Sequence, residues 1–359
     1  MRPLSFAMAG GGTGGHVVPN LAVARELRRR GHQPFFVGTQ RGLEARLVPR
    51  EGFPIEWIEI GGLNRVSAAE RLRTLWRLPL SIVRAYSILS ERSARGVFSM
   101  GGYAAGPVMI AAWLQNLPII AMEPNAVPGF TSRRMAAFVE HALLSFPEAL
   151  RYFPRGSAEL TGLPVREEFF RIPTKSRGET LNILITGGSR GSRTLNTAAA
   201  ESWRLFRASG CPVRMVLQTG PEAHEALSRK FADAGIPGEV VPFVHDMPAA
   251  FAEADIVVAR SGAGSVSELA AAGKPSVLVP FPFAADQHQL RNAEALQRIG
   301  AARLVLDGEM NGERLYAELT EMAAEPGLLE RMGAAARAFA KPGAAARAAD
   351  LLVELGKSV

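Results

Sequence analysis

The sequence is poor in the residue types that hold metals. Its 359 residues include one cysteine, Cys211, and six aspartates, none of which precedes Asp233. A single cysteine excludes an internal disulfide and a thiolate metal cluster, and it favours a reducing compartment. The aspartates form no Asp-X-Asp pair of the kind that presents a divalent cation to a diphosphate, and no His/Cys cluster has zinc-ligand spacing. We therefore expect chemistry that needs no metal and no other cofactor.

Long apolar runs are also missing. No stretch approaches the roughly 18 apolar residues that span a bilayer, and we expect no signal peptide, because no apolar core after Met1 precedes a small-residue cleavage site. The P-loop pattern G-x-x-x-x-G-K-[ST] is absent as well. With 47% hydrophobic and 21% charged residues, the chain is expected to be a folded globular protein. We expect it in the cytosol or at the cytosolic side of a membrane.

Glycine, by contrast, is abundant near the N-terminus. An apolar run at 4–9 leads into five glycines between Gly10 and Gly15, followed by His16 and a helix-like segment. Backbone N–H groups of such a loop approach anions closely, and the helix N-terminus adds its positive end. The loop therefore predicts an anion site, and His16 is the first candidate for proton chemistry.

The same loop contains the dinucleotide-binding pattern G-x-G-x-x-G at Gly10, Gly12 and Gly15. In dinucleotide-binding proteins a carboxylate about 20 residues further on, at the end of the second strand, binds a ribose. Here the second apolar run ends at Val37, and the nearest acid, Glu44, lies beyond the expected strand tip. The pattern therefore favours a phosphate or another polar ligand over NAD.

Strand-like runs alternate with helix-length segments along the whole chain, which predicts an α/β fold with parallel sheets. A polar, proline-bearing stretch near 161–177 is typical of a linker, and after it a strand, a glycine turn at 187–191 and a helix repeat the opening arrangement. Two Rossmann-like domains facing a cleft are therefore predicted, with their glycine loops at the carboxyl ends of the strands. The expected strands are 4–9, 33–37, 55–60, 96–99, 119–122, 142–145, 181–186, 213–218, 238–244, 256–259, 276–280 and 303–305.

A second set of polar residues follows strands of the second half. Residues 260–268, Arg-Ser-Gly-Ala-Gly-Ser-Val-Ser-Glu, come directly after the expected strand 256–259. Small residues let a helix N-terminus approach an anion, and Ser265 adds a hydroxyl donor. Glu268 fits two roles, as a favourable partner of the helix dipole or as a bidentate acceptor for two ribose hydroxyls. Amides between 286 and 293 suit sugar hydroxyls, because they both donate and accept. Together these features predict a nucleotide-sugar pocket.

Positive charge is unevenly distributed. The chain has 41 basic and 34 acidic residues, a net charge of +7, which suggests an acidic partner. Seven arginines but only two glutamates lie between 64 and 95, among apolar residues that are more numerous than one buried helical stripe requires. A core helix and a basic, apolar surface on anionic lipid both explain this pattern. Nucleic acid is not an expected partner, since aromatic interleaving is slight and no binding motif occurs.

Seven motifs occur in order along the chain. They are G-G-T-G-G-H at 11–16, G-G-Y at 101–103, E-x-N at 123–125, G-x-P-V-R at 162–166, G-G-S-x-G at 187–191, R-S-G-A-x-x-x-S-E at 260–268 and H-Q-x-x-N-A at 288–293. They resemble the motifs of the MurG family of peptidoglycan glycosyltransferases over nearly the whole chain. The resemblance implies the GT-B fold and an inverting, metal-independent hexosyltransferase. Such an enzyme transfers N-acetylglucosamine from UDP-GlcNAc to the 4-hydroxyl of undecaprenyl-diphospho-N-acetylmuramoyl-pentapeptide.

In that family the reaction converts lipid I to lipid II for cell wall biogenesis, cell shape and cell division. The resemblance implies a peripheral protein at the cytoplasmic face of the plasma (inner) membrane. It assigns acceptor and membrane binding to residues 1–163, with 344–359 packing back on them, and UDP-GlcNAc binding to residues 164–343. The expected partners are UDP-GlcNAc, lipid I, an anionic membrane surface and other cell-wall synthesis proteins.

The resemblance also implies roles for individual residues. His16 would lie near the acceptor hydroxyl, either as general base or as a group that positions the acceptor. The remaining acceptor-side residues are Thr13, Gly14, Gly15 and Asn125. The donor-side residues are Arg166 and Ser189 near the UDP, the backbone of Val244 at the uracil, Ala263, Gly264, Ser265, Val266 and Ser267 at the diphosphate and sugar, Glu268 at the ribose, and Gln289 at the GlcNAc hydroxyls. The membrane-contact residues are Leu75, Trp76, Leu78, Leu80, Ile82, Val83 and Trp113.

Two residues depart from the family pattern. Pro124 stands where glutamine is common, which removes an N–H and a side-chain amide from the acceptor-side turn. Arg190 follows Ser189 where glutamine is common, and it places a positive charge beside the expected diphosphate. Neither departure touches the other donor residues.

Three other functions differ from this one in the residues that they need. A dehydrogenase that binds NAD at the first loop would need an acid after the second strand. Another GT-B UDP-sugar enzyme, such as a soluble-acceptor glycosyltransferase or a UDP-GlcNAc 2-epimerase, shares the donor half but does not need the basic, apolar segment 64–95. A non-catalytic, membrane-docked nucleotide-sugar sensor would keep Ser189 and Glu268 but does not need His16.

Overall fold

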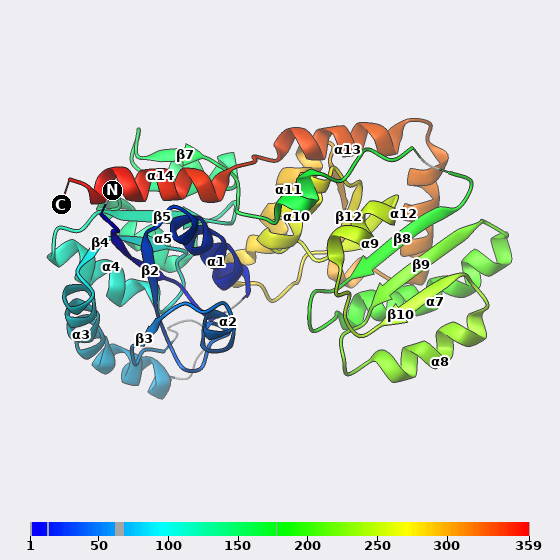
Figure 1. The fold of residues 1–359 in the computed structure, drawn as a ribbon. Helices are drawn as coiled ribbons and strands as arrows, with labels where there is room; N and C mark the ends of the chain where they lie inside the picture. The colour runs from blue at the N-terminus through cyan, green and yellow to red at the C-terminus, as the bar shows by residue number, and fades with distance from the viewer. Residues whose placement is uncertain (1, 13, 62–67, 177, 359) are drawn as a thin grey trace. The chain divides into compact units, whose positions relative to one another are not determined.

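The structure, a computed structural model, describes residues 2–12, 14–61, 68–176 and 178–358, and the side chains of 68–73 and 75 lie outside the description. The chain divides into two compact units: Met1–Pro164 with Pro342–Val359 form unit 1, and Val165–Lys341 form unit 2. In each unit, helices cover a parallel sheet (Figure 1). The predicted α/β class with two Rossmann-like domains is confirmed.

Unit 1 contains a seven-stranded sheet in the order β3-β2-β1-β4-β5-β6-β7, in which neighbouring strands run parallel. The strands are β1 (Ser5–Ala9), β2 (Gln33–Gly38), β3 (Ile55–Trp57), β4 (Ala94–Ser99), β5 (Ile119–Glu123), β6 (His141–Leu144) and β7 (Ala158–Leu160). The helices are α1 (Gly14–Arg29), α2 (Glu44–Arg50), α3 (Ala68–Glu91), α4 (Ala105–Leu114), α5 (Phe130–Met135) and α14 (Ala344–Gly356), with 3-10 turns η1 (Ala136–Phe138) and η2 (Pro147–Tyr152).

The middle of this sheet is apolar because helices cover both of its faces. Phe6, Ala7, Met8 and Ala9 of β1 are fully buried. Ala9 pairs with a residue of β2 on one side and with a residue of β4 on the other. The loops that follow β1, β2 and β4 therefore leave the same edge of the sheet, where their side chains meet.

The C-terminal helix α14 packs on unit 1, against elements that are distant from it in the sequence. Gly356 lies so close to Phe6 that a Cβ would stand 2.8 Å from the aromatic ring. The guanidinium of Arg347 forms an ion pair with Glu159 of β7 at 2.7 Å. Contacts with α1 and β4 complete this packing.

Unit 2 contains a six-stranded parallel sheet in the order β10-β9-β8-β11-β12-β13. The strands are β8 (Leu181–Thr186), β9 (Val213–Gln218), β10 (Gly238–Val241), β11 (Ile256–Ala259), β12 (Ser276–Leu278) and β13 (Ala302–Leu304). The helices are α6 (Glu167–Phe170), α7 (Arg193–Ser209), α8 (His224–Ala234), α9 (Met247–Glu253), α10 (Ala263–Ala272), α11 (His288–Arg298), α12 (Gly312–Ala324) and α13 (Leu328–Phe339), with 3-10 turns η3 (Ala285–Gln287) and η4 (Asp307–Glu309).

The segment predicted as a linker differs from expectation. Residues from Val165 belong to unit 2, and Phe169 of α6 is buried against Phe251, with ring centroids 5.2 Å apart. The guanidinium of Arg337 donates to the carbonyl of Ile172 at 2.7 Å. The prediction of a linker is therefore wrong for residues 165–172. The buried side chains of Phe169 and Ile172 hold this otherwise polar stretch on unit 2. The short strand β7 was not predicted either.

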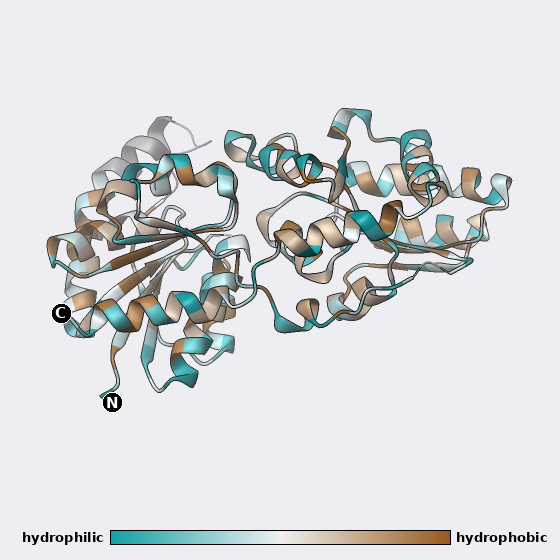
Figure 2. Ribbon diagram, turned by 90° about the horizontal axis from the view of Figure 1, so that it is seen from above, coloured by the Kyte–Doolittle hydropathy of each residue, from teal (hydrophilic) through white to brown (hydrophobic). Residues whose placement is uncertain are grey.

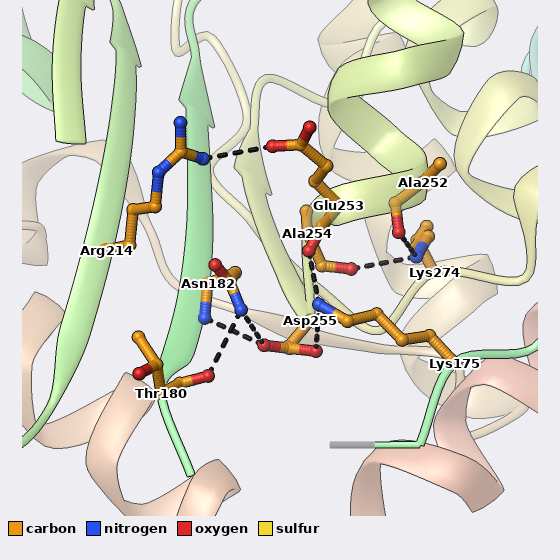
Figure 3. A network of polar contacts seen from close by, with 9 residues as sticks. All are labelled: Lys175, Thr180, Asn182, Arg214, Ala252, Glu253, Ala254, Asp255 and Lys274. Carbon is orange, nitrogen blue, oxygen red and sulfur yellow. Dashed lines mark hydrogen bonds and ion pairs between the residues drawn. The ribbon is translucent and has the colours of Figure 1, made fainter. Parts of the chain in front are cut away.

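Two lysines stabilise the end of α9 in unit 2 (Figure 3). Lys175 donates to the carbonyl of Glu253 and forms an ion pair with Asp255 at 3.0 Å. Lys274 donates to the carbonyl of Ala254 at 2.8 Å. Cations are favourable there because carbonyls at a helix C-terminus carry partial negative charge. Burial, together with the neighbouring charge of Lys175, lowers the pKa of Lys274 to about 8.

Candidate active site

The N-terminal glycine loop contains positive φ angles, which residues with a side chain rarely adopt. Gly10 has φ 145° and Gly12 has φ 92°. A Cβ at Gly12 would also stand 3.0 Å from the Tyr103 ring, so both conformation and space require glycine. Helix α1 begins at Gly14, directly after the loop. Thr13, predicted to face the acceptor, lies outside the described residues.

Glu44, which follows the second strand in the sequence, lies against this loop. Its carboxylate oxygen Oε2 accepts the N–H of Gly12 at 2.7 Å. The other oxygen accepts the hydroxyl of Thr39 at 3.0 Å, and that hydroxyl lies 3.1 Å from the hydroxyl of Tyr103. One buried carboxylate thus connects the loops that follow β1, β2 and β4. The sequence did not indicate that Glu44 binds the loop backbone, because its place after the second strand suggested only the question of a ribose ligand.

His16 is half-buried in the first turn of α1, beside the same loop. Its Nδ1 lies 3.3 Å from the carbonyl oxygen of Gly11. A carbonyl oxygen only accepts, so this hydrogen bond requires a proton on Nδ1 and makes Nε2 the basic nitrogen. A Cβ at Gly102 would stand 3.2 Å from that carbonyl oxygen and 3.4 Å from Nδ1. The second glycine turn, which follows β4, therefore encloses the imidazole.

The turn that follows β5 is organised by Glu123. Its buried carboxylate accepts the backbone N–H of Asn125 at 3.0 Å, the side-chain amide of Asn125 at 3.2 Å and the N–H of Gly129 at 3.3 Å. Burial raises the pKa of Glu123 to about 7, although these donors oppose the increase. Pro124 is buried between the two partners, and its missing N–H removes none of these hydrogen bonds. Asn125 therefore lies at the same sheet edge as His16, in unit 1.

The glycine turn of unit 2 is held by a neutral side chain. Gln218 donates to the hydroxyl of Thr186 at 3.2 Å and to the carbonyl of Gly188 at 2.8 Å. Its amide oxygen accepts the N–H of Val244 at 2.9 Å, so that N–H is already bonded within unit 2. Ser189 and the neighbouring Arg190 are exposed at the tip of the turn. Sequence analysis missed Gln218 because it ends a strand and belongs to no motif.

Helix α10 presents its N-terminus at the end of β11. Its N-cap residue Gly262 has no side chain, so the first-turn N–H groups have no side-chain cap. No heavy atom lies within 4 Å of a Cβ built on Gly264, which leaves open space beside that turn. Ser265 and Ser267 are partly exposed, whereas the side chain of Val266 is buried in the core and can contribute only its backbone. Ala263 is nearly buried.

Glu268 follows on the same helix and faces Arg166. Burial raises the pKa of Glu268 to about 7, and the positive charge of Arg166 opposes the increase. Arg166 occupies the N-cap position of α6, and its guanidinium lies 5.0 Å from the centroid of the Phe169 ring. The two charged residues that the motifs predict for the nucleotide are therefore neighbours within unit 2.

Gln289 is fixed beside the same helix. Its side-chain oxygen accepts the N–H of Phe281 at 3.0 Å, and its backbone oxygen accepts the hydroxyl of Ser261 at 2.8 Å. Asp286 and Gln287, directly before α11, have φ 49° and 52°. Such strained backbone is concentrated at functional sites. The structure thus brings together, in unit 2, the residues predicted for ribose, diphosphate and sugar.

The predicted membrane-contact residues separate by exposure. Trp76, Leu80 and Val83 of α3 are 77%, 72% and 65% exposed, and Trp113 of α4 is 51% exposed. Leu78 and Ile82 are partly buried, and the side chain of Leu75 lies outside the description. Hydrophobic residues elsewhere concentrate in the strands (Figure 2). Within the described ranges, no helix combines the length and apolarity that a membrane span requires.

The described residues contain no group of three or more His, Cys, Asp or Glu side chains that is arranged to hold a metal ion. Donors that remain for an anionic ligand are the uncapped N-terminus of α10, the turn around Ser189 and the guanidinium of Arg166. Such groups stabilise negative charge on a leaving diphosphate by preorganised dipoles and hydrogen bonds.

Known proteins match along both units. Residues 6–144 match the glycosyltransferase family 28 N-terminal domain, and residues 182–348 match the glycosyltransferase family 28 C-terminal domain. A UDP-N-acetylglucosamine–N-acetylmuramyl-(pentapeptide) pyrophosphoryl-undecaprenol N-acetylglucosamine transferase of Solibacter usitatus is 63% identical over 353 residues, which are 98% of this chain and 96% of the relative. The enzyme of the same name from Myxococcus xanthus is 38% identical, with 98% of this chain and 93% of the relative covered.

A solved structure agrees with these relatives. The crystal structure of Acinetobacter baumannii MurG superposes with a TM-score of 0.84 at 33% identity, covering 98% of this chain and all of that one (100%). Family matches, relatives and structure all extend over nearly the entire chain. The chain therefore belongs to glycosyltransferase family 28 and, within it, to the MurG enzymes.

Proposed function

We propose that this protein is the hexosyltransferase that moves N-acetylglucosamine from UDP-GlcNAc to the 4-hydroxyl of undecaprenyl-diphospho-N-acetylmuramoyl-pentapeptide, making lipid II from lipid I. The observation that carries this proposal is the 63% identity to the Solibacter usitatus transferase across 98% of the chain. The geometry of both units supports it. In unit 1 an imidazole has its Nδ1 against the carbonyl oxygen of Gly11, and in unit 2 a helix N-terminus without a side-chain cap is followed on the same helix by the carboxylate of Glu268.

Unit 2 binds the donor in this proposal. The N–H groups at the start of α10, from Ala263 to Ser265, and the hydroxyl of Ser189 bind the diphosphate. Glu268 accepts hydrogen bonds from the two ribose hydroxyls, and Arg166 adds positive charge next to it. Val244 contacts the uracil through its backbone, and its N–H must exchange its bond to Gln218 to do so. Gln289 binds the sugar hydroxyls through its side-chain NH₂, since its oxygen is bonded to Phe281.

Unit 1 supplies the proton acceptor. The oxygen of the acceptor 4-hydroxyl attacks C1 of N-acetylglucosamine while the bond from C1 to the UDP oxygen breaks, which inverts the anomeric centre. Nε2 of His16 takes the hydroxyl proton, and UDP leaves with the electron pair of the broken bond. Negative charge on the leaving diphosphate is stabilised by the α10 N-terminus and by hydroxyl donors in place of a metal. Asn125 contacts the acceptor beside His16.

Membrane docking is part of the same proposal. The acceptor is anchored in lipid, and the apolar side chains Trp76, Leu80, Val83 and Trp113 are exposed on α3 and α4. Arg77 and Arg84 are partly exposed on α3. Aromatic and aliphatic side chains beside arginine favour the surface of an anionic bilayer. Co-sedimentation with vesicles of anionic and of zwitterionic lipid tests this, and equal recovery with both compositions would contradict it.

The reaction itself is tested with purified protein, labelled UDP-GlcNAc and a short-chain lipid I analogue in the presence of EDTA. We expect labelled disaccharide product only when the acceptor is present, and no loss of rate with EDTA. Release of free sugar without transfer, an epimerised UDP-sugar, or a strict requirement for a divalent cation would overturn the proposal.

A further inference from the structure

Glu44 is a buried carboxylate outside the set of residues that contact substrate in the proposed reaction. Its residue is 1% exposed. Oε2 accepts the N–H of Gly12 at 2.7 Å, and Oε1 accepts the N–H and the hydroxyl of Thr39 at 3.1 and 3.0 Å. A carboxylate is buried at low cost only when donors surround it in this way. Both oxygens are therefore engaged by unit 1 itself.

Three glycines make the space that this carboxylate fills. A Cβ at Gly11 would stand 2.3 Å from Oε1, and a Cβ at Gly42 would stand 1.9 Å from Oε2. A Cβ at Gly38 would stand 2.7 Å from the Cγ of Glu44. These glycines thus make room for the carboxylate of Glu44. The N–H of Gly12 is already hydrogen-bonded to that carboxylate in the absence of substrate.

A single peptide bond connects this carboxylate to the imidazole. The N–H of Gly12 and the carbonyl of Gly11 belong to the same amide group. The carboxylate of Glu44 accepts from the N–H end, while Nδ1 of His16 lies 3.3 Å from the carbonyl end. Negative charge at the N–H end polarises the amide and makes the carbonyl oxygen a stronger acceptor, because hydrogen bonds in series reinforce one another.

We propose that Glu44 is a positioning residue for His16 and that it acts through the peptide bond between Gly11 and Gly12. The polarised carbonyl holds the proton on Nδ1, which orients the ring and keeps the lone pair on Nε2. It also stabilises the imidazolium that forms when Nε2 takes the acceptor proton. The carboxylate of a Ser-His-Asp triad does the same by direct contact with Nδ1–H. This inference rests on the proposed function for the catalytic step, but not for the protonation pattern of the ring.

The variant Glu44→Gln tests the proposal, because a carboxamide has one acceptor oxygen and its NH₂ group faces a donor, either the Gly12 N–H or the groups of Thr39. In full-length protein labelled with ¹⁵N-histidine, we expect the ring nitrogens of His16 to show Nδ1–H and an unprotonated Nε2. We expect a mixture of the two tautomers in Glu44→Gln. We expect kcat to fall about tenfold, as for other partners that orient a histidine from behind, with KM for UDP-GlcNAc unchanged.

A second variant, Gly42→Ala, tests whether the position of the Glu44 carboxylate matters when its charge is kept. Gly42→Ala keeps the negative charge but displaces it, since its Cβ would stand 1.9 Å from Oε2. Its matched control is Gly308→Ala, where no heavy atom lies within 4 Å of the added Cβ. The control for charge is Glu51→Gln, which removes an exposed carboxylate that binds Arg25 in the same unit. Urea unfolding of the full chain, followed by circular dichroism, reports whether each variant is folded.

Tautomer mixing and a lower kcat in both Glu44→Gln and Gly42→Ala, with neither in the controls, would support the proposal. Wild-type ring-nitrogen signals in folded Glu44→Gln, or an unchanged kcat in both variants, would overturn it. A wild-type protein that performs no acceptor-dependent transfer would contradict the proposed function, while the ring-nitrogen signals would still decide whether Glu44 positions His16.

Discussion

The two glycine loops of this protein begin with the same local pattern and are completed by different side chains. In unit 1 the Gly12 N–H donates to the carboxylate of Glu44 at 2.7 Å. In unit 2 the turn is held by Gln218, whose amide donates to the carbonyl of Gly188 at 2.8 Å. A loop that already contains a negative charge repels another anion, whereas a neutral partner leaves the turn attractive to a phosphate.

This difference teaches that a glycine loop before a helix is not by itself a phosphate site. The ligand that such a loop can bind depends on which side chain from another part of the fold forms hydrogen bonds with its backbone. With Glu44 the loop becomes a support for the imidazole of His16 in our proposal, whereas the turn held by Gln218 leaves the exposed Ser189 as the proposed donor to a diphosphate. Variants that alter one unit at a time break this contrast.

The largest effect is expected for His16→Ala. Removing the proposed proton acceptor should lower kcat by about 10²- to 10⁴-fold, the usual contribution of general base catalysis. Binding of UDP-GlcNAc, measured by calorimetry, should not change, because the donor residues are in unit 2. His224→Ala is a suitable control, since Nε2 of that ring lies 3.2 Å from the carbonyl oxygen of Val240, in unit 2. A His16→Ala enzyme with wild-type kcat would remove the proton-transfer role.

The next effect concerns the geometry of the loop in unit 2. In Gly191→Ala the added Cβ would stand 1.8 Å from the carbonyl oxygen of Thr219, at φ 75°, and the backbone must move. We expect the free energy of unfolding to fall by about 3 kcal/mol or more, together with UDP-GlcNAc affinity. Gly188→Ala is the matched control, because φ is 83° but the space is open, and its cost should be about 1 kcal/mol. Equal losses in urea unfolding would contradict this account.

Glu268→Ala should act on the donor alone. Losing the acceptor for two ribose hydroxyls should raise KM for UDP-GlcNAc about 10- to 100-fold, as expected for hydrogen bonds to a charged group, with a smaller change in kcat. Glu225→Ala removes an exposed carboxylate that pairs with Arg229 and should change neither constant. An unchanged KM in Glu268→Ala would disprove the ribose assignment.

The smallest effect is a pH dependence of donor binding. The pKa of Glu268 is raised to about 7, so the free protein takes up a proton there as the pH falls below 7, whereas ribose hydroxyls favour the ionised carboxylate. UDP-GlcNAc affinity should therefore be constant above pH 8 and should fall by about tenfold between pH 8 and 6. Calorimetry of wild type and Glu268→Gln measures this. A pH dependence that persists in Glu268→Gln would assign the titration to another group.

Much of the fold could be read from local pattern. Continuous apolar runs such as 181–186 predicted β8 to the residue, because a strand buried on both faces has few polar residues. Short or weakly apolar elements could not be found in this way. The strand β7 has the sequence Ala-Glu-Leu and is only partly buried, and α6 has four residues, so both depend on their neighbours for stability.

The residues of the candidate site also divide into those that local motifs predict and those that only long-range contacts reveal. Gly12, His16 and Glu268 lie in motifs with a local physical meaning, so the sequence singles them out as candidates. Glu44 and Gln218 were missed, since each acts on residues about 30 positions away in the chain through side-chain hydrogen bonds. Neither hydrophobic periodicity nor motif spacing predicts which polar side chain forms hydrogen bonds with the backbone of a given loop.

The sequence alone therefore determined the α/β class, the repeated strand–glycine–helix arrangement and the family, because these depend on local composition and on motif order. Only the tertiary structure decided how each glycine loop is used. Parallel strands bring the loops after β1, β2 and β4 to one edge, and there a buried carboxylate must find donors. Glu44 finds one of them in the Gly12 N–H, and the loop that resembles a phosphate site becomes the support of His16.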